Sequence, residues 1–163
     1  MEAQEKRKRY QRIRQQLAEL FRKTSDPIAR MATAAALLHH KMSGFSWTGF
    51  YLLRPPAAPG GEPELVVGPY QGPLACLWLP PHQGVCWAGI DRGEPVVVPD
   101  VHAFPGHIAC DPRSASEIVV PVRDGSGAIV GVLDIDSTKP AHFDEVDAAE
   151  LQALVALIYA PAT

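Results

Sequence analysis

The sequence predicts an α+β domain in which helices at both ends of the chain pack against an antiparallel sheet of about six strands. Apolar residues recur at helical spacing in the first 42 residues and again after residue 144. The segment between these helical regions is rich in β-branched and aromatic residues and is interrupted by Pro and Gly, which is typical of strands and turns. At 163 residues the chain is long enough for one domain but not for two.

The first helix is predicted as a basic extension over residues 1–25, ahead of a domain that covers residues 26–160. The first 14 residues carry six basic and two acidic side chains, a charge of +4, whereas the whole chain carries −3. The acidic remainder argues against nucleic acid as a partner. Because the basic residues lead into Ile13, Leu17 and Leu20 at helical spacing, we expect a solvated helix end instead of an arm that binds phosphate.

Two further helices have clear start signals. Asp26 is placed to act as an N-cap, and Pro27 suits the first helical position. The last helix begins at Asp144, which can cap it while Asp147 stands three residues on. The apolar faces of these two helices are expected to contain Ile28, Met31, Ala35 and Leu38, and Leu151, Leu154, Val155 and Ile158, respectively.

The strands are predicted from their composition and from the turns that separate them. The expected elements are strands at 45–53, 64–70, about 76–79, 95–99, 117–123 and 128–136, and a short helix at 84–91. Asp124-Gly125-Ser126-Gly127 joins the last two strands and predicts a hairpin. Residues 100–116 show no periodicity, and a mixed, partly apolar loop of this length is more often functional than disordered.

The composition excludes several classes of protein. Hydrophobic residues make up 47% of the chain and charged residues 20%, so disordered, collagen-like and low-complexity proteins are excluded. No stretch reaches the ~18–20 apolar residues that a membrane span requires, and charged residues stand where a signal sequence would begin. We therefore expect a cytoplasmic protein that does not bind a membrane.

The first strand and the last strand place chemically unusual side chains on one face each. Trp47 and Tyr51 flank Gly49 on a strand face, which suggests an apolar slot for a ligand, the alternative being two core aromatics. Asp134 and Asp136 are also two apart, so their carboxylates lie roughly 7 Å apart on one face.

The two aspartates require compensation if they are buried. A bound ammonium group or a metal ion would supply it, and a raised pKa would instead make one acid a proton donor. Glu117 begins the neighbouring strand of the hairpin and is expected to reach the same place. The alternative is a solvated strand end.

Three cysteines are too few, and of the wrong parity, for a secreted disulfide scaffold. Cys76, Cys86 and Cys110 are separated by 10 and 24 residues, whereas structural zinc sites place at least one pair of ligands two to four residues apart. Zinc is therefore disfavoured, although three histidines are available at His82, His102 and His107. Three inert buried thiols are the other alternative, but Cys110 lies in the non-periodic loop and is poorly explained as core.

Five motifs taken together resemble the free methionine-(R)-sulfoxide reductases, small enzymes built on a single GAF domain. They are WTGFY (47–51), GPYQGPLAC (68–76), GVC (84–86), VPDVHAFPGHIACDPRSASEIVVPV (98–122) and GVLDIDS (131–137). The resemblance covers residues 26–158. The chain departs from it at Trp87, where a glycine is expected, and at Thr48, where a larger β-branched residue is common.

The resemblance implies a GAF-like fold and the reduction of free methionine (R)-sulfoxide. It implies that Cys110 is the nucleophile, that Cys76 resolves the oxidised form, and that Cys86 has a secondary part. It also implies thioredoxin as the reductant, a homodimer, and no metal or organic cofactor.

The resemblance further implies a substrate site made of acids and aromatics. Glu117, Asp134 and Asp136 would hold the amino group and the sulfoxide end of the substrate. Trp47 and Tyr51 would enclose its methyl group.

These residues combine into one mechanistic hypothesis. The Cys110 thiolate attacks the sulfoxide sulfur while Glu117 or Asp136, with a raised pKa, protonates the departing oxygen. The resulting sulfenic acid condenses with Cys76 to a disulfide. Two alternatives from other classes stay open: a GAF-type sensor that binds a small ligand without turnover, and a regulatory zinc or redox-sensing module.

Overall fold

The computed structural model describes residues 1–162 and contains one six-stranded antiparallel sheet in the order β3-β2-β1-β6-β5-β4. The strands are β1 (Trp47–Arg54), β2 (Glu64–Gln71), β3 (Trp78–Leu79), β4 (Val96–Val98), β5 (Ser116–Arg123) and β6 (Ile129–Ser137). The predicted α+β class and the six antiparallel strands are confirmed, and most boundaries agree within two residues. Cys76 lies before β3 and not within it, because only Trp78 and Leu79 pair with β2.

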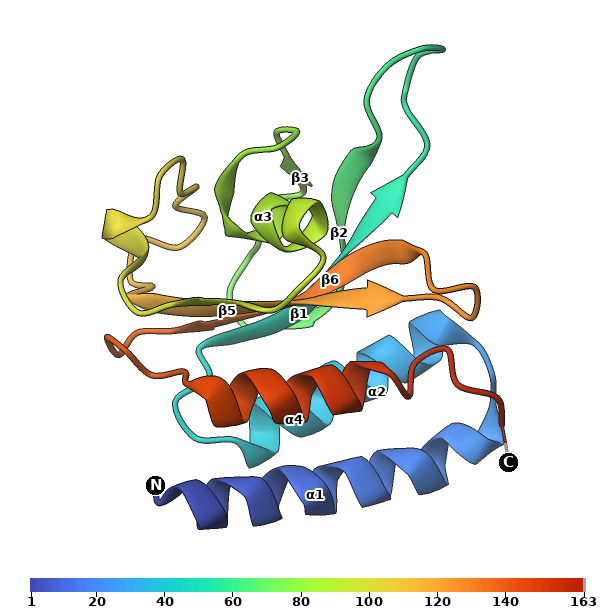
Figure 1. Ribbon diagram of the computed structural model, residues 1–163, viewed down its shortest axis with the longest axis vertical. Helices are drawn as coiled ribbons and strands as arrows, with labels where there is room; N and C mark the ends of the chain where they lie inside the picture. The colour runs from blue at the N-terminus through green and yellow to red at the C-terminus, as the bar shows by residue number, and fades with distance from the viewer. Residues whose placement is uncertain (163) are drawn as a thin grey trace.

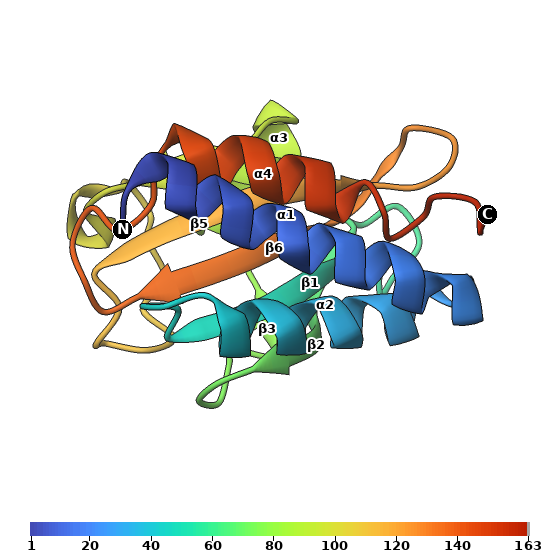
Figure 2. The ribbon, with the colours of Figure 1, turned by 90° about the horizontal axis from the view of Figure 1, so that it is seen from below.

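The helices lie on both faces of the sheet. α2 (Pro27–Lys41) and α4 (Glu145–Val155) pack on one face, and α1 (Ala3–Leu20) lies across them as an outer layer (Figures 1 and 2). α3 (Gly84–Arg92) and the loops around it cover the other face. None of the helices in residues 1–162 is both long and apolar enough to cross a membrane.

Strand alternation divides the buried residues into two clusters, one on each face. Phe50, Leu133 and Ile135 belong to the large core under α1, α2 and α4. Trp47, Tyr51 and other residues of the opposite face belong to a smaller cluster that includes α3. The second face is therefore only partly used for packing.

The capping residues behave as predicted. The Asp26 side chain accepts hydrogen bonds from the Ile28 and Ala29 amides, with Pro27 at the start of α2. Asp144 and Asp147 form a reciprocal capping box at the start of α4. At the hairpin, the Asp124 side chain accepts from the amides of Ser126 and Ala128.

Two apolar positions were wrongly expected on buried faces. Ile28 is 46% exposed and Leu20 is 41% exposed, although their helical neighbours are buried. Ile28 lies in the first turn of α2, before the buried residues Arg30 and Met31, and Leu20 directly precedes Phe21, which takes the buried position at the end of α1. Periodicity identifies the face of a helix but not how far along the helix the neighbouring elements reach.

The basic end of α1 is attached to α4 and is not simply solvated. Lys6 Nζ lies 2.9 Å from Asp144 Oδ2 and 2.8 Å from Asp147 Oδ2. The buried Tyr10 hydroxyl donates to Asp147 Oδ1 at 2.6 Å. The expectation of a solvated end is wrong for Lys6, whose charge balances the acidic capping box. The division of the chain at residue 25 stays a prediction.

Arg30 of α2 is almost fully buried and links the start of α2 to the residues that follow α1 and α4. Its guanidinium donates to five backbone carbonyl oxygens at 2.8–3.2 Å, namely those of Phe21, Thr24, Leu157, Ile158 and Ala160. These carbonyls follow α1 and α4, where helix ends leave acceptors without intrahelical donors. The positive charge also suits the negative ends of the helix dipoles.

Replacing Arg30 by Met should lower the free energy of unfolding by about 3 kcal/mol, because several partly or fully buried carbonyls lose their donor. Urea denaturation measures this change. Arg22→Met is the matched control, since Arg22 is exposed and, among residues 1–162, its ion-pair partner is Glu19; it should change stability by less than about 0.5 kcal/mol. Equal effects of the two substitutions would contradict the role given to Arg30.

Candidate active site

A small, partly open cavity lies on the α3 side of the sheet. Its volume is about 50 Å³, and its walls come from β1, β5, β6, α3 and the two loops that carry Cys76 and Cys110. Seven of the eight predicted site residues line it, namely Trp47, Tyr51, Cys86, Cys110, Glu117, Asp134 and Asp136, and His107 lines it as well. Cys76 does not line the cavity but is bonded to Cys110 at its edge.

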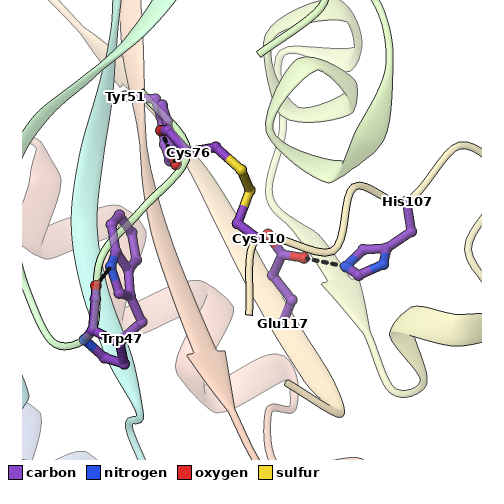
Figure 3. The surroundings of a disulfide bond; sticks show 7 residues. Trp47, Tyr51, Cys76, His107, Cys110 and Glu117 are labelled. Atoms are coloured by element: carbon purple, nitrogen blue, oxygen red, sulfur yellow. Dashed lines mark hydrogen bonds and ion pairs between the residues drawn. A yellow bond between two sulfur atoms is a disulfide. The ribbon is translucent and has the colours of Figure 1, made fainter. Parts of the chain in front are cut away.

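Cys76 and Cys110 form a disulfide (Figure 3). Their Cα atoms are 5.5 Å apart although 34 residues separate them in the chain. This distance lies within the ~4.4–6.8 Å that a disulfide requires. Cys86 is a free, buried thiol on α3. The structure thus places two redox-capable sulfurs at the mouth of the cavity and a third sulfur inside it.

Strand register brings the three carboxyl groups together. Glu117 on β5 is paired with Asp136 on β6, and Trp47 on β1 is paired with Asp136 from the other side. Asp134 lies two residues along β6 on the same face. Glu117 is 6% exposed and Asp134 is 5% exposed. The cavity wall is therefore a row of acids fixed on adjacent strands.

No lysine or arginine among residues 1–162 pairs with these three acids. The nearest basic group is His107, whose Nε2 lies 3.9 Å from Glu117 Oε2 (Figure 3). Burial lowers the pKa of His107, and nearby His102 lowers it further, so this imidazole favours its neutral form. One oxygen of Asp134, Oδ1, is buried without any hydrogen-bond partner. The cluster has an excess of acceptors and no permanent cation.

The acids differ in how strongly the site favours protonation. Burial raises the pKa of Glu117 well above its ordinary value, and the charges of Asp134 and Asp136 raise it further. Burial and the charge of Asp134 likewise raise the pKa of Asp136. Burial also raises the pKa of Asp134, but hydrogen bonds from Glu117 and Cys86 act in the opposite direction. Glu117 and Asp136 are thus the acids that retain a proton most readily.

Cys86 is held as a neutral thiol. Burial raises its pKa well above the ordinary value, and the charges of Asp134 and Glu117 raise it further. A thiol is a poor nucleophile in this form, since the thiolate is the reactive species. Cys86 is buried, whereas Cys110 lies at the partly exposed rim of the cavity.

The aromatic residues position the loop that carries Cys76. The Tyr51 hydroxyl donates to the Cys76 carbonyl oxygen at 3.0 Å, and Trp47 Nε1 donates to the Pro73 carbonyl oxygen at 3.1 Å (Figure 3). The Trp47 ring stacks on Tyr51 and on Tyr70, with centroids 5.8 and 5.2 Å apart. Tyr70 was not singled out from the sequence, although it belongs to the GPYQG motif.

The apolar ligand slot that was expected over Gly49 is absent, because Trp47 and Tyr70 fill this space. A Cβ atom at this position would collide with Tyr70 Cβ and come within 2.6 Å of Trp47 Cη2. The space is filled by the side chains of the neighbouring residues, so Gly49 allows aromatic packing and does not itself line the cavity.

The two departures from the family motifs lie away from the cavity. Trp87 is buried, donates from Nε1 to the Leu79 carbonyl oxygen and packs against the His82 ring. Thr48 points to the helical layer, where its hydroxyl is 3.1 Å from His39 Nδ1. Neither residue is part of the cavity wall.

The comparisons with known proteins agree with this geometry. The family profile of the GAF domain matches residues 17–159. The chain is 43% identical over 129 residues to the free methionine-R-sulfoxide reductase of Escherichia coli (strain K12), an alignment that covers 79% of this chain and 73% of that protein. It is 37% identical over 135 residues to the enzyme of the same name from Saccharomyces cerevisiae, covering 80% of this chain and 73% of that one.

A solved structure gives the same result. The X-ray structure of free methionine-R-sulfoxide reductase from Neisseria meningitidis in complex with its substrate superposes with a TM-score of 0.82 at 41% identity. The match covers 92% of this chain and 86% of that one.

Gly49→Ala should displace the Trp47 ring and lower the free energy of unfolding by about 1–3 kcal/mol, because the added methyl group overpacks the site. Urea denaturation followed by tryptophan fluorescence measures both effects. Gly125→Ala is the control, since a Cβ there meets no atom within 4 Å. A stable Gly49→Ala protein with unchanged fluorescence would show that the aromatic packing does not require glycine.

Proposed function

Because the chain belongs to the GAF domain family and, within it, to the free methionine-R-sulfoxide reductases, a group of oxidoreductases, we propose that it reduces free methionine (R)-sulfoxide to methionine. The observation that carries this proposal is the Cys76–Cys110 disulfide at the edge of an acidic cavity. A domain that only binds a ligand has no need for two bonded sulfurs there. This observation favours the reductase over a small-ligand sensor.

In the first step, the thiolate of reduced Cys110 attacks the sulfoxide sulfur. A carboxyl group protonates the sulfoxide oxygen, this oxygen passes from the methionine sulfur to Cys110 Sγ, and the bond between the two sulfurs breaks, so that Cys110 becomes a sulfenic acid. Methionine leaves as the reduced product. Cys110 has then been oxidised by the two electrons that the sulfoxide gained.

In the second step, the Cys76 thiol condenses with the sulfenic acid and releases water. The product is a Cys76–Cys110 disulfide of the kind seen in the structure. Thioredoxin, an external dithiol, then exchanges with this bond and returns both cysteines to thiols. The cycle needs no metal and no organic cofactor, and we place it in the reducing cytoplasm.

The proton donor is one of the two acids that face each other across β5 and β6. Glu117 and Asp136 are paired in the sheet, and Asp134 lies on the same face, without a lysine or arginine partner in residues 1–162. Carboxylates this close cannot all ionise in a buried site. One acid therefore keeps a proton that it can donate to the departing oxygen.

Asp134 is proposed to bind the α-ammonium group of the substrate. Its Oδ1 atom is buried without a partner, and a free amino acid supplies the missing cation. The nitrogen of a peptide-bound residue is a neutral amide, which would leave the carboxylate buried and unpaired. Trp47 and Tyr51 would enclose the substrate methyl group. The site should therefore select the free amino acid.

The homodimer implied by the family resemblance is part of the proposal as well. Size-exclusion chromatography with light scattering tests it directly, since a dimer doubles the mass of the 17.6 kDa chain.

Replacing the two bonded cysteines separately should stop the reaction at different points. Cys110→Ser should abolish methionine release, since serine is not a nucleophile towards the sulfoxide. Cys76→Ser should release one methionine per chain and then stall, because the sulfenic acid has no resolving thiol. Single-turnover assays with chromatographic detection of methionine distinguish these outcomes. Continued turnover by Cys76→Ser would assign the resolving role to another thiol, such as Cys86.

Replacing Asp134 by Asn should raise the KM for free methionine sulfoxide roughly 30- to 160-fold, as expected for loss of a charged hydrogen bond of about 2–3 kcal/mol. Activity towards an oxidised methionine peptide should be low in both proteins. Asp91→Asn is the matched control, because Asp91 is exposed and pairs with His82 outside the cavity. An unchanged KM for Asp134→Asn would remove Asp134 from the substrate site.

A further inference from the structure

Cys86, Glu117 and Asp134 form a cluster of potential metal ligands inside the cavity. The Cys86 sulfur and one carboxylate oxygen from each acid all lie within 4.8 Å of one another, and all three residues are buried. They come from α3, β5 and β6, so three separate elements of regular structure hold them in place. Their positions 86, 117 and 134 are too far apart in the chain for a spacing rule to detect.

We propose that Cys86, Glu117 and Asp134 bind Zn²⁺ and that the bound ion blocks the cavity. This site differs from the histidine-containing zinc site that the sequence disfavours.

The ligand types favour zinc over magnesium or calcium. A thiolate is a typical zinc ligand, and carboxylate oxygens complete many zinc sites, whereas magnesium and calcium prefer oxygen alone. Zinc–ligand bonds of about 2.0–2.3 Å place tetrahedral ligand atoms roughly 3.5 Å apart. From separations of at most 4.8 Å, the three atoms therefore need to approach one another by no more than about 1.3 Å. Three protein ligands leave a fourth position for water.

The surroundings of Asp134 independently indicate a missing cation. Its Oδ1 atom is buried without a partner, Asp134 lines the cavity, and no lysine or arginine of residues 1–162 pairs with the cluster. A cavity of about 50 Å³ is large enough for an ion and a water molecule, since one water needs roughly 10–15 Å³. A divalent ion would satisfy the free oxygen and balance the carboxylates.

The third cysteine is available as a ligand in the oxidised protein. The disulfide occupies Cys76 and Cys110 and leaves Cys86 as the free thiol. Binding would convert this thiol to a zinc-bound thiolate and release its proton to solvent. The site therefore does not require the catalytic sulfurs to be reduced.

Inhibition follows if the proposed function is correct, because Asp134 would serve both the substrate ammonium group and the metal ion. Zinc and substrate would then exclude each other from the cavity. Metal binding itself does not depend on the reductase activity.

Cobalt titration of the oxidised protein tests the site without any enzymatic assay. Co²⁺ takes the place of Zn²⁺, and a bound thiolate produces a sulfur-to-cobalt charge-transfer absorption. Because Cys86 is the free thiol in this form, the absorption identifies it as a ligand. We expect saturation at one ion per chain and loss of the signal when Zn²⁺ is added.

Substitutions separate this site from surface binding. Cys86→Ser should remove the charge-transfer absorption, and Glu117→Gln or Asp134→Asn should weaken cobalt binding tenfold or more. His82→Ala is the control, since His82 lies between Asp91 and Glu62 on the surface, and it should leave the absorption unchanged.

The proposal is overturned if the wild-type protein shows no thiolate absorption at saturating Co²⁺, or if the absorption persists in Cys86→Ser. It is also overturned if neither acid substitution weakens binding. Circular dichroism checks the folding of each variant, and the two isosteric acid substitutions keep the test decisive should Cys86→Ser not fold. Reductase activity measured in the presence of a chelator tests the proposed function separately.

Discussion

The site depends on one constraint: three neighbouring carboxyl groups, two of them buried and one partly exposed, have no permanent cation beside them. Glu117, Asp134 and Asp136 lie on one face of two paired strands, and their mutual repulsion is not relieved by a lysine or arginine within residues 1–162. Such a cluster must hold protons, bind a cation, or do both at different stages. The proposed proton donation and the proposed ammonium recognition are thus two consequences of one arrangement of charge, and the metal site proposed above is a third.

The two faces of the sheet differ in composition: one is apolar and forms the main core, and the other carries the acidic residues. The face under α1, α2 and α4 is apolar and is closed by the hydrogen bonds of Arg30 and by the contacts of Lys6 and Tyr10 with α4. The opposite face carries the acids and is only partly filled by α3. The acids lie on strands, whose hydrogen bonds hold their backbone in place. The two bonded cysteines lie in loops, and these loops bring together residues that are far apart in the sequence. Stability and chemistry are largely separated by strand alternation.

Local patterns predicted the fold and part of the site. The two-residue period of a strand placed Asp134 and Asp136 on one face, and the hairpin brought Glu117 beside them. Contacts between distant segments could not be predicted in this way. The spacing of the cysteines does not say which two bond; only the family resemblance indicated the pair. Likewise, the reason for Gly49 lies in Tyr70 on another strand, and the partners of Lys6 lie at the opposite end of the chain.

The lack of an internal cation is itself informative about function. A lysine reaching Asp134 would satisfy its free oxygen and relieve the repulsion among the acids. It would also fill the place of the substrate ammonium group, so binding would have to displace an existing ion pair. Because the acids have no cation partner, their repulsion destabilises the folded chain, and a cation that binds in the cavity relieves this repulsion. The extensive bonding of Arg30 on the other face then stabilises a domain whose catalytic face is electrostatically unfavourable.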